Sequence, residues 1–140
     1  MLVWIFQSGE PIHTDSGEVR PMRAINLSHA LIKRNHKVVL WTSAFYHQER
    51  FHRSRVLKRI KYNENLQINL IPSIGYKKNI GLGRLIDHAH LAINLFKELS
   101  KPIQEKPNIA FIGYPPIETA AVLTFWLKRN NLCLLYTSDA

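Results

Sequence analysis

The sequence predicts an α/β protein whose sheet is doubly wound and mostly parallel, with helices on both faces. Residues 2–6 form a short, continuous apolar run of β-branched and aromatic side chains, which is typical of an inner strand buried on both faces. Apolar residues at helical spacing come next, followed by a second apolar run at residues 38–41. A strand, a helix and a strand in this order form a right-handed crossover unit, and strands and helices go on alternating along the chain.

The helix of this first unit is expected at residues 21–34. Pro21 suits a first helical turn, because its missing N–H would have no partner there. Asn35 ends the helix, since asparagine tolerates the left-handed backbone of a helix stop. The 3.6-residue period predicts an inner face of Ala24, Leu27, Ala30 and Leu31, widened by Ile25 and Ile32.

The middle of the chain predicts a loop, two strands and a long helix. Residues 43–55 mix aromatic, histidine and arginine side chains without a regular period, which indicates an exposed loop. Residues 59–62 and 66–71 are expected to be strands joined by a turn, and Pro72 closes the second. The strongest helical period starts at residue 82 and ends before Pro102. Its predicted inner face is Leu85, Ile86, Ala89, Ile93, Phe96 and Leu99, with Ala92 alongside.

A buried strand is expected at residues 108–112, followed by a tight turn at 113–116 into a last helix. Glu118 lies in the first turn of that helix, where the dipole favours a carboxylate. The predicted inner face is Ile117, Ala120, Ala121, Thr124 and Leu127. Beyond Asn131, the apolar run at residues 132–136 has the pattern of an edge strand.

The composition limits the classes of protein to consider. With 46% hydrophobic and 21% charged residues, the chain is expected to fold as one globular domain. Its longest apolar runs fall short of the ~20 residues that span a bilayer. No basic leader precedes the first strand, and the single Cys133 excludes an internal disulfide, so a reducing, cytoplasmic location is expected.

The net charge of +9 predicts an affinity for anions. Part of this charge lies in one basic run: Arg50, Arg53, Arg55, Lys58, Arg59 and Lys61. The run is either a solvated surface or a contact with an anionic membrane face. Nucleic acid would require a continuous basic stripe with stacking aromatics, and no recognised module is present, so no nucleic-acid partner is expected. A basic binding module for nucleic acid or an anionic membrane surface is nevertheless the alternative function.

The motifs favour a polar ligand over a bound cofactor or metal. The loop at residues 9–17 lacks the Gly-x-Gly-x-x-Gly spacing of dinucleotide-binding proteins. The spacings of the histidines do not suit zinc, so we expect no cofactor and no metal. Loops at the carboxyl ends of parallel strands bind ligands in such folds, and Gly17 and Arg20 lie there beside a helix N-terminus. His47, next to Tyr46, is a candidate for contacting sugar hydroxyls.

Three segments resemble the N-terminal domain of glycosyltransferase family 4, especially the subgroup that assembles bacterial surface polysaccharides. The first segment runs from Gly17 and Arg20-Pro21 through Asn26-Leu27-Ser28-His29-Ala30-Leu31 to Trp41-Thr42-Ser43. The second is the aromatic and histidine loop Ser43-Ala44-Phe45-Tyr46-His47. The third is Ile112-Gly113-Tyr114-Pro115-Pro116, where the subgroup has a Gly-x-x-Pro turn. The similarity spans residues 1–131.

The resemblance implies a retaining, metal-independent enzyme of the GT-B type, with two Rossmann-like domains and a cleft between them. This chain would be the incomplete acceptor-side half, inactive alone. The nucleotide-sugar co-substrate would be held chiefly by a C-terminal domain, and the acceptor would be a glycan or a lipid-pyrophosphate. The expected substrate-binding residues are Gly17, Arg20, His47, Gly113 and Tyr114.

Two departures from the family limit what the resemblance implies. The His-x-His that some relatives have near Gly113 is missing, so no catalytic residue is assigned. Residues 132–140 resemble translated sequencing-adapter read-through, and the domain is therefore expected to comprise residues 1–131. A peripheral position at the inner membrane face is compatible with a lipid-linked acceptor.

Overall fold

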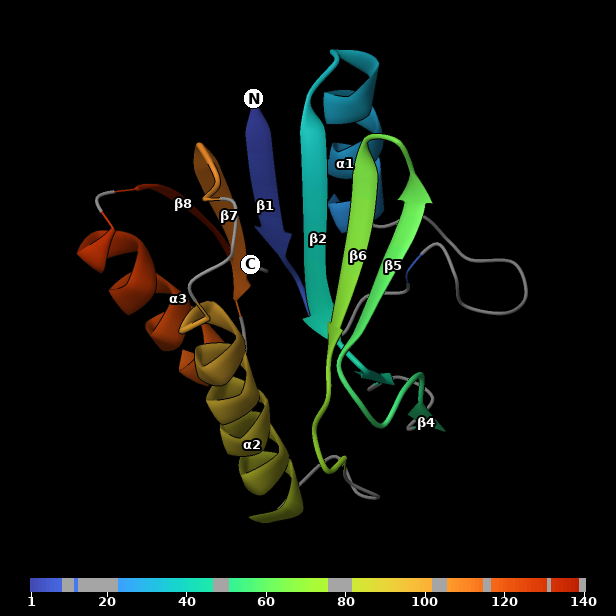
Figure 1. Ribbon diagram of the computed structural model, residues 1–140. Helices are drawn as coiled ribbons and strands as arrows, with labels where there is room; N and C mark the ends of the chain where they lie inside the picture. Colours follow the sequence, from blue (N-terminus) through green and yellow to red (C-terminus); the bar gives the residue numbers. More distant parts are fainter. Residues whose placement is uncertain are drawn as a thin grey trace.

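The computed structural model describes residues 1–8, 12, 23–46, 51–75, 82–101, 106–114, 117–130 and 132–138. These ranges form a mixed α/β fold with a six-stranded sheet of order β5-β6-β2-β1-β7-β8, a small β3-β4 sheet and three helices (Figure 1). The elements are β1 (Leu2–Phe6), α1 (Arg23–Lys33), β2 (Lys37–Ser43), β3 (Phe45–Tyr46), β4 (Phe51–His52), β5 (Lys58–Asn63), β6 (Leu66–Ile71), α2 (Leu82–Leu99), β7 (Ile109–Tyr114), α3 (Ile117–Arg129) and β8 (Cys133–Ser138).

The large sheet is parallel except at one edge. Strand β1 pairs in parallel with β2 and β7, β2 pairs with β6, and β7 pairs with β8, whereas β5 is antiparallel to β6. The chain therefore builds from β1 toward β6 and β5, and then crosses through α2 to β7 on the other side of β1. The carboxyl ends of β6, β2, β1 and β7 meet at one edge, next to this reversal of strand order.

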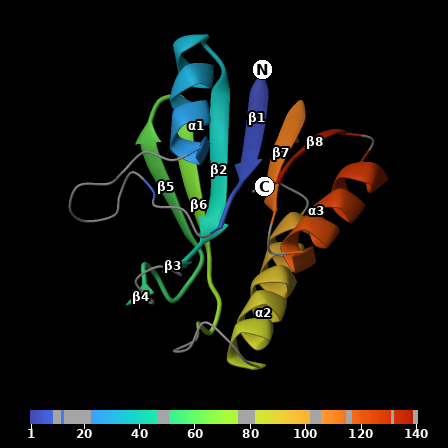
Figure 2. The same cartoon turned by 180° about the vertical axis from the view of Figure 1, so that it is seen from behind.

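Helices cover both faces of the sheet. Side chains of β1 alternate, so that Trp4 and Phe6 pack with α2 and α3, whereas Val3 and Ile5 pack with α1. Figure 1 and Figure 2 show α2 and α3 side by side on one face and α1 on the opposite face. The α/β class predicted from the sequence is therefore confirmed.

An aromatic cluster fills the core between the sheet and the α2/α3 layer. Trp4 stacks on Trp126 of α3, with ring centroids 5.2 Å apart and an interplanar angle of 13°. Phe6 stacks on Trp41 in the same way, at 5.3 Å and 13°. Trp4 also contacts Phe6 and Trp41, at 5.9 and 5.0 Å, so the two stacked pairs form one unit.

Helix α1 ends as its sequence predicts, but its inner face differs. Asn35 has a left-handed backbone with φ 65°, which confirms the predicted helix stop. Ala30 is exposed instead of buried, and Ser28 is fully buried in its place. The burial of Ser28 is possible because its hydroxyl donates to the carbonyl of Ala24, at 2.7 Å.

The predicted inner face of α2 is wrong for most of its residues, although Leu99 and Ala92 are buried as expected. The side chains expected to be buried there are mostly exposed: Leu85, Ile86, Ala89, Ile93 and Phe96. The opposite face packs on the sheet through Leu91, Leu95 and Leu99, and it also buries Asp87 and Glu98. Helix α2 thus has apolar residues at helical spacing on two faces, and the period alone does not distinguish them.

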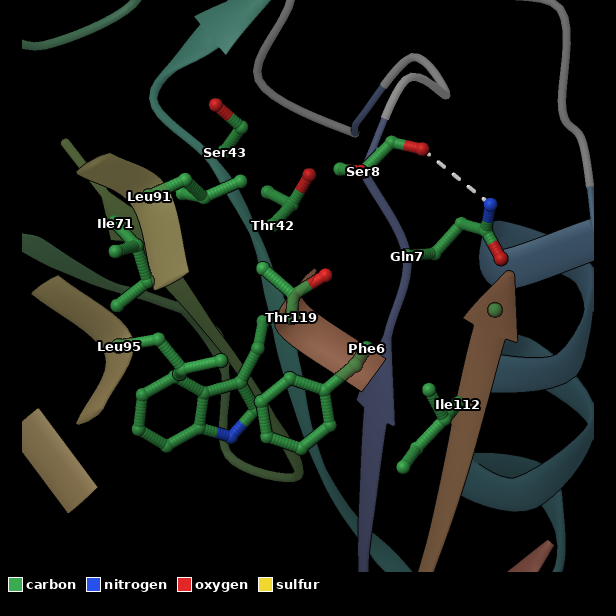
Figure 3. A pocket seen from close by; sticks show the side chains of 12 residues that line it. Phe6, Gln7, Ser8, Thr42, Ser43, Ile71, Leu91, Leu95, Ile112 and Thr119 are labelled. Atoms are coloured by element: carbon green, nitrogen blue, oxygen red, sulfur yellow. Dashed lines mark hydrogen bonds between the residues drawn. The ribbon is translucent and has the colours of Figure 1, made fainter. Parts of the chain in front are cut away.

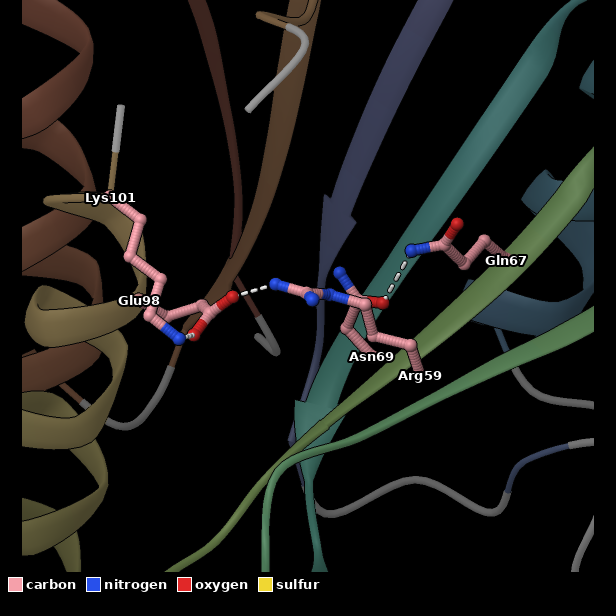
Figure 4. A network of polar contacts seen from close by, with 5 residues as sticks. All are labelled: Arg59, Gln67, Asn69, Glu98 and Lys101. Atoms are coloured by element: carbon pink, nitrogen blue, oxygen red, sulfur yellow. Dashed lines mark hydrogen bonds and ion pairs between the residues drawn. The ribbon is translucent and has the colours of Figure 1, made fainter. Parts of the chain in front are cut away.

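The buried carboxylate of Glu98 selects the face of α2 that packs on the sheet. Arg59 of β5 forms an ion pair with Glu98, and the ammonium of Lys101 lies 2.8 Å from the same carboxylate (Figure 4). Because a buried charge requires partners of opposite sign, these contacts fix the rotation of α2 about its axis.

Two further predictions are corrected. On α3, Ala121 is exposed and Leu123 is fully buried, so the inner face is rotated relative to the expected one. Residues 43–55 are not simply an exposed loop, because Phe45 and Tyr46 are buried in the β3-β4 pair. The guanidinium of Arg53 lies 4.4 Å above the Tyr46 ring and also donates to the carbonyl of Ser43.

Part of the basic run lies on β5, the edge strand of the large sheet. Lys58, Arg59 and Lys61 are exposed along this strand, and lysines on an edge strand discourage pairing with other chains.

No helix within the described residues is long and apolar enough to cross a membrane.

Replacing Arg59 tests the role of the Glu98 contacts. Arg59→Ala removes one cationic partner of the buried Glu98, and we expect the free energy of unfolding to fall by about 1–3 kcal/mol. Lys58→Ala, on the same exposed strand, is the matched control and should change it by less than about 0.5 kcal/mol. Urea denaturation measures both. Equal effects of the two variants would show that the ion pair does not hold α2.

Candidate functional site

A pocket lies at the carboxyl ends of β1, β2, β6 and β7, beneath α2 and α3. Its cavity volume is about 30 Å³, and the hollow around it is partly open to solvent. Its polar lining is Gln7, Ser8, Thr42, Ser43 and Thr119, and its apolar lining is Phe6, Trp41, Ile71, Leu91, Leu95 and Ile112. Gly113 completes it. In Figure 3 the hydroxyls of Ser8, Thr42 and Ser43 lie in the upper part of the pocket, and Phe6, Leu95 and Ile112 lie in the lower part.

Two polar atoms of the lining are buried without a partner. The indole Nε1 of Trp41 and the hydroxyl of Thr42 make no hydrogen bond within the described residues. Trp41 is 2% exposed and Thr42 is 4% exposed. A buried polar atom left without a partner costs about 1–3 kcal/mol, so each of these atoms favours a ligand or water that can bond to it.

The other hydroxyl of β2 is already engaged. Ser43 Oγ accepts a hydrogen bond from the backbone N–H of Phe45, at 3.0 Å. Ser43 is therefore a fixed part of the wall, and it ties the β3-β4 pair to the end of β2. Within the described part of the chain, the Thr42 hydroxyl of this strand end has no partner.

Gly113 allows the side chain of Gln7 to lie across the end of β7. A Cβ added at Gly113 would lie 1.7 Å from Oε1 of Gln7, and the other two closest atoms also belong to the Gln7 amide. Gln7 is 8% exposed, and its amide Nε2 donates to the carbonyl of Ser8, at 3.3 Å. The absence of a side chain at Gly113 thus leaves room for the Gln7 amide across the end of β7, at the edge of the pocket.

Titratable groups lie next to the pocket on the two helices. His88 is one turn before Leu91, and its Nδ1 lies 3.9 Å from a carboxylate oxygen of Glu118, the residue before Thr119. Burial lowers the pKa of His88 from its ordinary value of 6.5, although Glu118 and Asp87 act in the opposite direction. His88 is therefore mainly neutral near pH 7 and can accept a proton or a hydrogen bond.

Asp87 holds the first turns of α2 against the segment that follows β6. Its Oδ1 accepts a hydrogen bond from the N–H of Gly75, at 2.7 Å, while Oδ2 is buried without a partner in the described residues. Gly75 has a left-handed backbone with φ 78°, and a Cβ there would lie 2.8 Å from Nε2 of His52. Burial is also the main cause that lowers the pKa of His52, and the nearby positive charge of Arg55 lowers it further.

The structure places two of the five predicted substrate-binding residues. Gly113 lines the pocket, and Tyr114 is the last residue of β7, at the same edge of the sheet. Gly17, Arg20 and His47 lie outside the described residues.

Sequence reasoning did not select the polar residues that line the pocket. Gln7 and Ser8 follow β1, Thr42 and Ser43 end β2, and Thr119 lies in the first turn of α3. The available signal was their position, because polar residues at the carboxyl ends of parallel strands face the ligand site of α/β sheets.

The described residues contain no group of three or more His, Cys, Asp and Glu side chains that could hold a metal ion. The expectation of a metal-free site remains a prediction.

No protein-family model matches this chain, and no curated protein matches it in sequence. The resemblance to glycosyltransferases therefore depends on the residues of the chain itself.

The contact between Gly113 and Gln7 predicts a specific pair of effects. Gly113→Ala should lower the free energy of unfolding by about 1–3 kcal/mol, because the new methyl displaces the packed amide. In the Gln7→Ala background, Gly113→Ala should lower the free energy of unfolding much less, because the three atoms closest to the new methyl belong to the Gln7 side chain and are absent there. Thermal denaturation of the four proteins of this cycle measures the coupling. Additive effects would contradict the proposed contact.

The lowered pKa of His88 predicts a pH-dependent stability. Above pH 6.5 the histidine is neutral in both states, and below it the unfolded chain takes up the proton first. The wild type should therefore lose stability as the pH falls from 6.5 toward the lowered pKa, and His88→Gln should lose less.

Urea denaturation at about pH 7.5 and about pH 5 measures this difference, with His29→Gln on the exposed side of α1 as the control. If His88→Gln and the wild type lose the same free energy between these two conditions, burial of His88 does not favour its neutral form.

Proposed function

We propose that this chain is the acceptor-side, N-terminal half of a retaining, nucleotide-sugar-dependent glycosyltransferase, with a doubly wound, Rossmann-like sheet of the GT-B type. The acceptor is a glycan or a glycan carried on a lipid pyrophosphate, and a further domain holds the nucleotide-sugar. The enzyme acts in the cytoplasm, where it meets its acceptor at the inner membrane face.

The observation that supports the proposal best is the buried Thr42 hydroxyl, which has no hydrogen-bond partner among the described residues, in a pocket at the carboxyl edge of the sheet. Together with the unpaired indole N–H of Trp41 and the amide of Gln7, it offers both donors and acceptors. A sugar presents hydroxyl groups that donate and accept in the same way. Apolar surface with a few placed polar groups is also the usual lining of a small-molecule site.

The charge of the pocket favours the acceptor over the nucleotide-sugar. None of its lining residues in the described chain is Lys, Arg, Asp or Glu. A pyrophosphate is normally paired with cationic side chains, which the described lining lacks, whereas a neutral glycan requires none. The position next to the reversal of strand order supports a ligand site, since α/β sheets bind ligands there.

The alternative of a basic nucleic-acid module has less support. Arg53 contacts Tyr46 and the carbonyl of Ser43, and Arg59 is paired with Glu98. Two arginines of the basic run thus make contacts within the fold. The buried Phe45 and Tyr46 offer no exposed stacking surface for bases.

Replacing the Thr42 hydroxyl should have opposite effects on binding and stability. Thr42→Val keeps the shape but removes the unpaired hydroxyl, so the free energy of unfolding should stay equal or rise by about 1 kcal/mol. The affinity for a glycan that bonds to this hydroxyl should fall about fivefold.

Titration calorimetry with a panel of hexose and N-acetylhexosamine disaccharides measures the affinity. Thr124→Val is the matched control, because the Thr124 hydroxyl donates to the carbonyl of Ala120 within α3 and does not line the pocket. Binding of no member of the panel, or equal affinities of the two variants, would contradict the assignment of the pocket.

The 140-residue chain alone should transfer no sugar from any nucleotide-sugar, because the proposed donor domain is not part of it. The measurement is release of free nucleotide from UDP-, GDP- and dTDP-sugars in the presence of the disaccharide panel. Multiple turnover by the purified chain would overturn the proposal of a half-enzyme.

A further inference from the structure

Helix α2 presents a continuous apolar stripe on the face that points away from the sheet. Its side chains recur at three- and four-residue spacing, so they lie on one side of the helix. Leu82 is 76% exposed, Leu85 58%, Ile86 and Ile93 53% each, and Phe96 49%. We call these five residues, together with the exposed Ala89, the outer stripe of α2.

The adjacent helix extends this apolar surface. Helices α2 and α3 lie side by side on the same face of the sheet, as Figure 1 and Figure 2 show. Phe125 of α3 is 57% exposed. Monomeric proteins rarely expose this many large apolar side chains on neighbouring positions, and such patches mark interaction sites.

The exposed charges on these two helices are all positive. Arg84 and Lys97 of α2 and Lys128 and Arg129 of α3 are exposed. Two of the three carboxylates on these helices, Asp87 and Glu98, are buried, and the third, Glu118, is 32% exposed and lies 3.9 Å from His88. The outer surface of the α2/α3 layer therefore combines apolar side chains with positive charge.

This combination identifies the occupant. Two copies of the chain would bring like charges together, which opposes a symmetric contact. An anionic lipid surface instead accepts the apolar stripe among its acyl chains and pairs with the flanking cations. A convex helix face requires no complementary groove on such a surface.

We propose that the outer stripe of α2, with Phe125 and the flanking cations of α3, is a docking surface for an anionic lipid bilayer. This inference depends on the exposed faces of α2 and α3 and not on sugar transfer. It also moves the membrane contact away from the basic run around β5, whose Arg53 and Arg59 are engaged within the fold.

Co-sedimentation of the 140-residue chain with phosphatidylcholine vesicles, with and without phosphatidylglycerol, tests the proposal. The wild type should bind the vesicles that contain phosphatidylglycerol more strongly, and added salt should weaken this preference. Ile93→Asp should lower the bound fraction about tenfold, because a charge replaces a side chain that enters the acyl region.

Matched controls separate the docking surface from general effects of charge. Val56→Asp makes the same change at a residue that is 68% exposed outside α2 and α3, and it should stay within about twofold of the wild type. Lys58→Gln with Lys61→Gln, on the β5 edge, should retain most of the binding. Circular dichroism confirms that each variant is folded.

Three results would overturn the proposal. The first is the absence of any preference of the wild type for the anionic vesicles. The second is equal binding of Ile93→Asp and Val56→Asp, or a larger loss from the β5 variant, which would return the contact to the basic run. The third is a dimer of the wild type in sedimentation velocity that Ile93→Asp dissociates, because a second copy would then occupy the stripe.

Discussion

The packing of Trp4 is the contact on which the rest of this fold depends. Its indole stacks on Trp126 of α3 and also meets Phe6 and Trp41, so one side chain joins the central strand, its neighbour and a helix of the covering layer. Large aromatic side chains contribute much of the apolar area that stabilises a core. The same packing holds Trp41 against Phe6 at the end of the sheet, where Trp41 lines the pocket. The core therefore sets the geometry of the candidate site.

Local patterns were sufficient to predict the strands of the large sheet and the end of α1, but not the β3-β4 pair or the orientation of the helices. The sequence predicted β1, β6 and the left-handed Asn35 correctly, because each of these features depends on adjacent residues. The buried face of α2 could not be predicted from the sequence. It is chosen by Arg59 and by the N–H of Gly75, which are distant in sequence from Glu98 and Asp87. A helix with two apolar faces leaves that choice to tertiary contacts.

The sequence predicted where the candidate site lies in the sheet, but not most of the residues that line it. The carboxyl edge of the sheet follows from the order of strands and helices, and Gly113 was selected there. The side chains that line the pocket depend on which residue of each strand end points inward, and on close contacts such as that of Gln7 with Gly113. On this account α2 serves two surfaces, since Leu91 and Leu95 line the pocket while Ile93 and Phe96 face outward. A bilayer bound to the outer stripe would keep a lipid-linked acceptor near the pocket.

A glycan in this pocket would bond to the Trp41 indole and the Thr42 hydroxyl, the two lining groups that are buried without a partner in the described residues. The chain contains three tryptophans, and among the described pocket residues only Trp41 contributes an indole, which gives a specific reporter. Trp126 provides an internal reference, because its Nε1 already donates to the carbonyl of Leu99, at 3.1 Å. The measurement is a nitrogen-15 correlation spectrum of the indole N–H groups during titration with the disaccharide panel. Binding of a glycan should shift the Trp41 resonance while that of Trp126 stays in place. A disaccharide that binds, as judged from broadening of its own signals, without moving the Trp41 resonance would contradict this prediction.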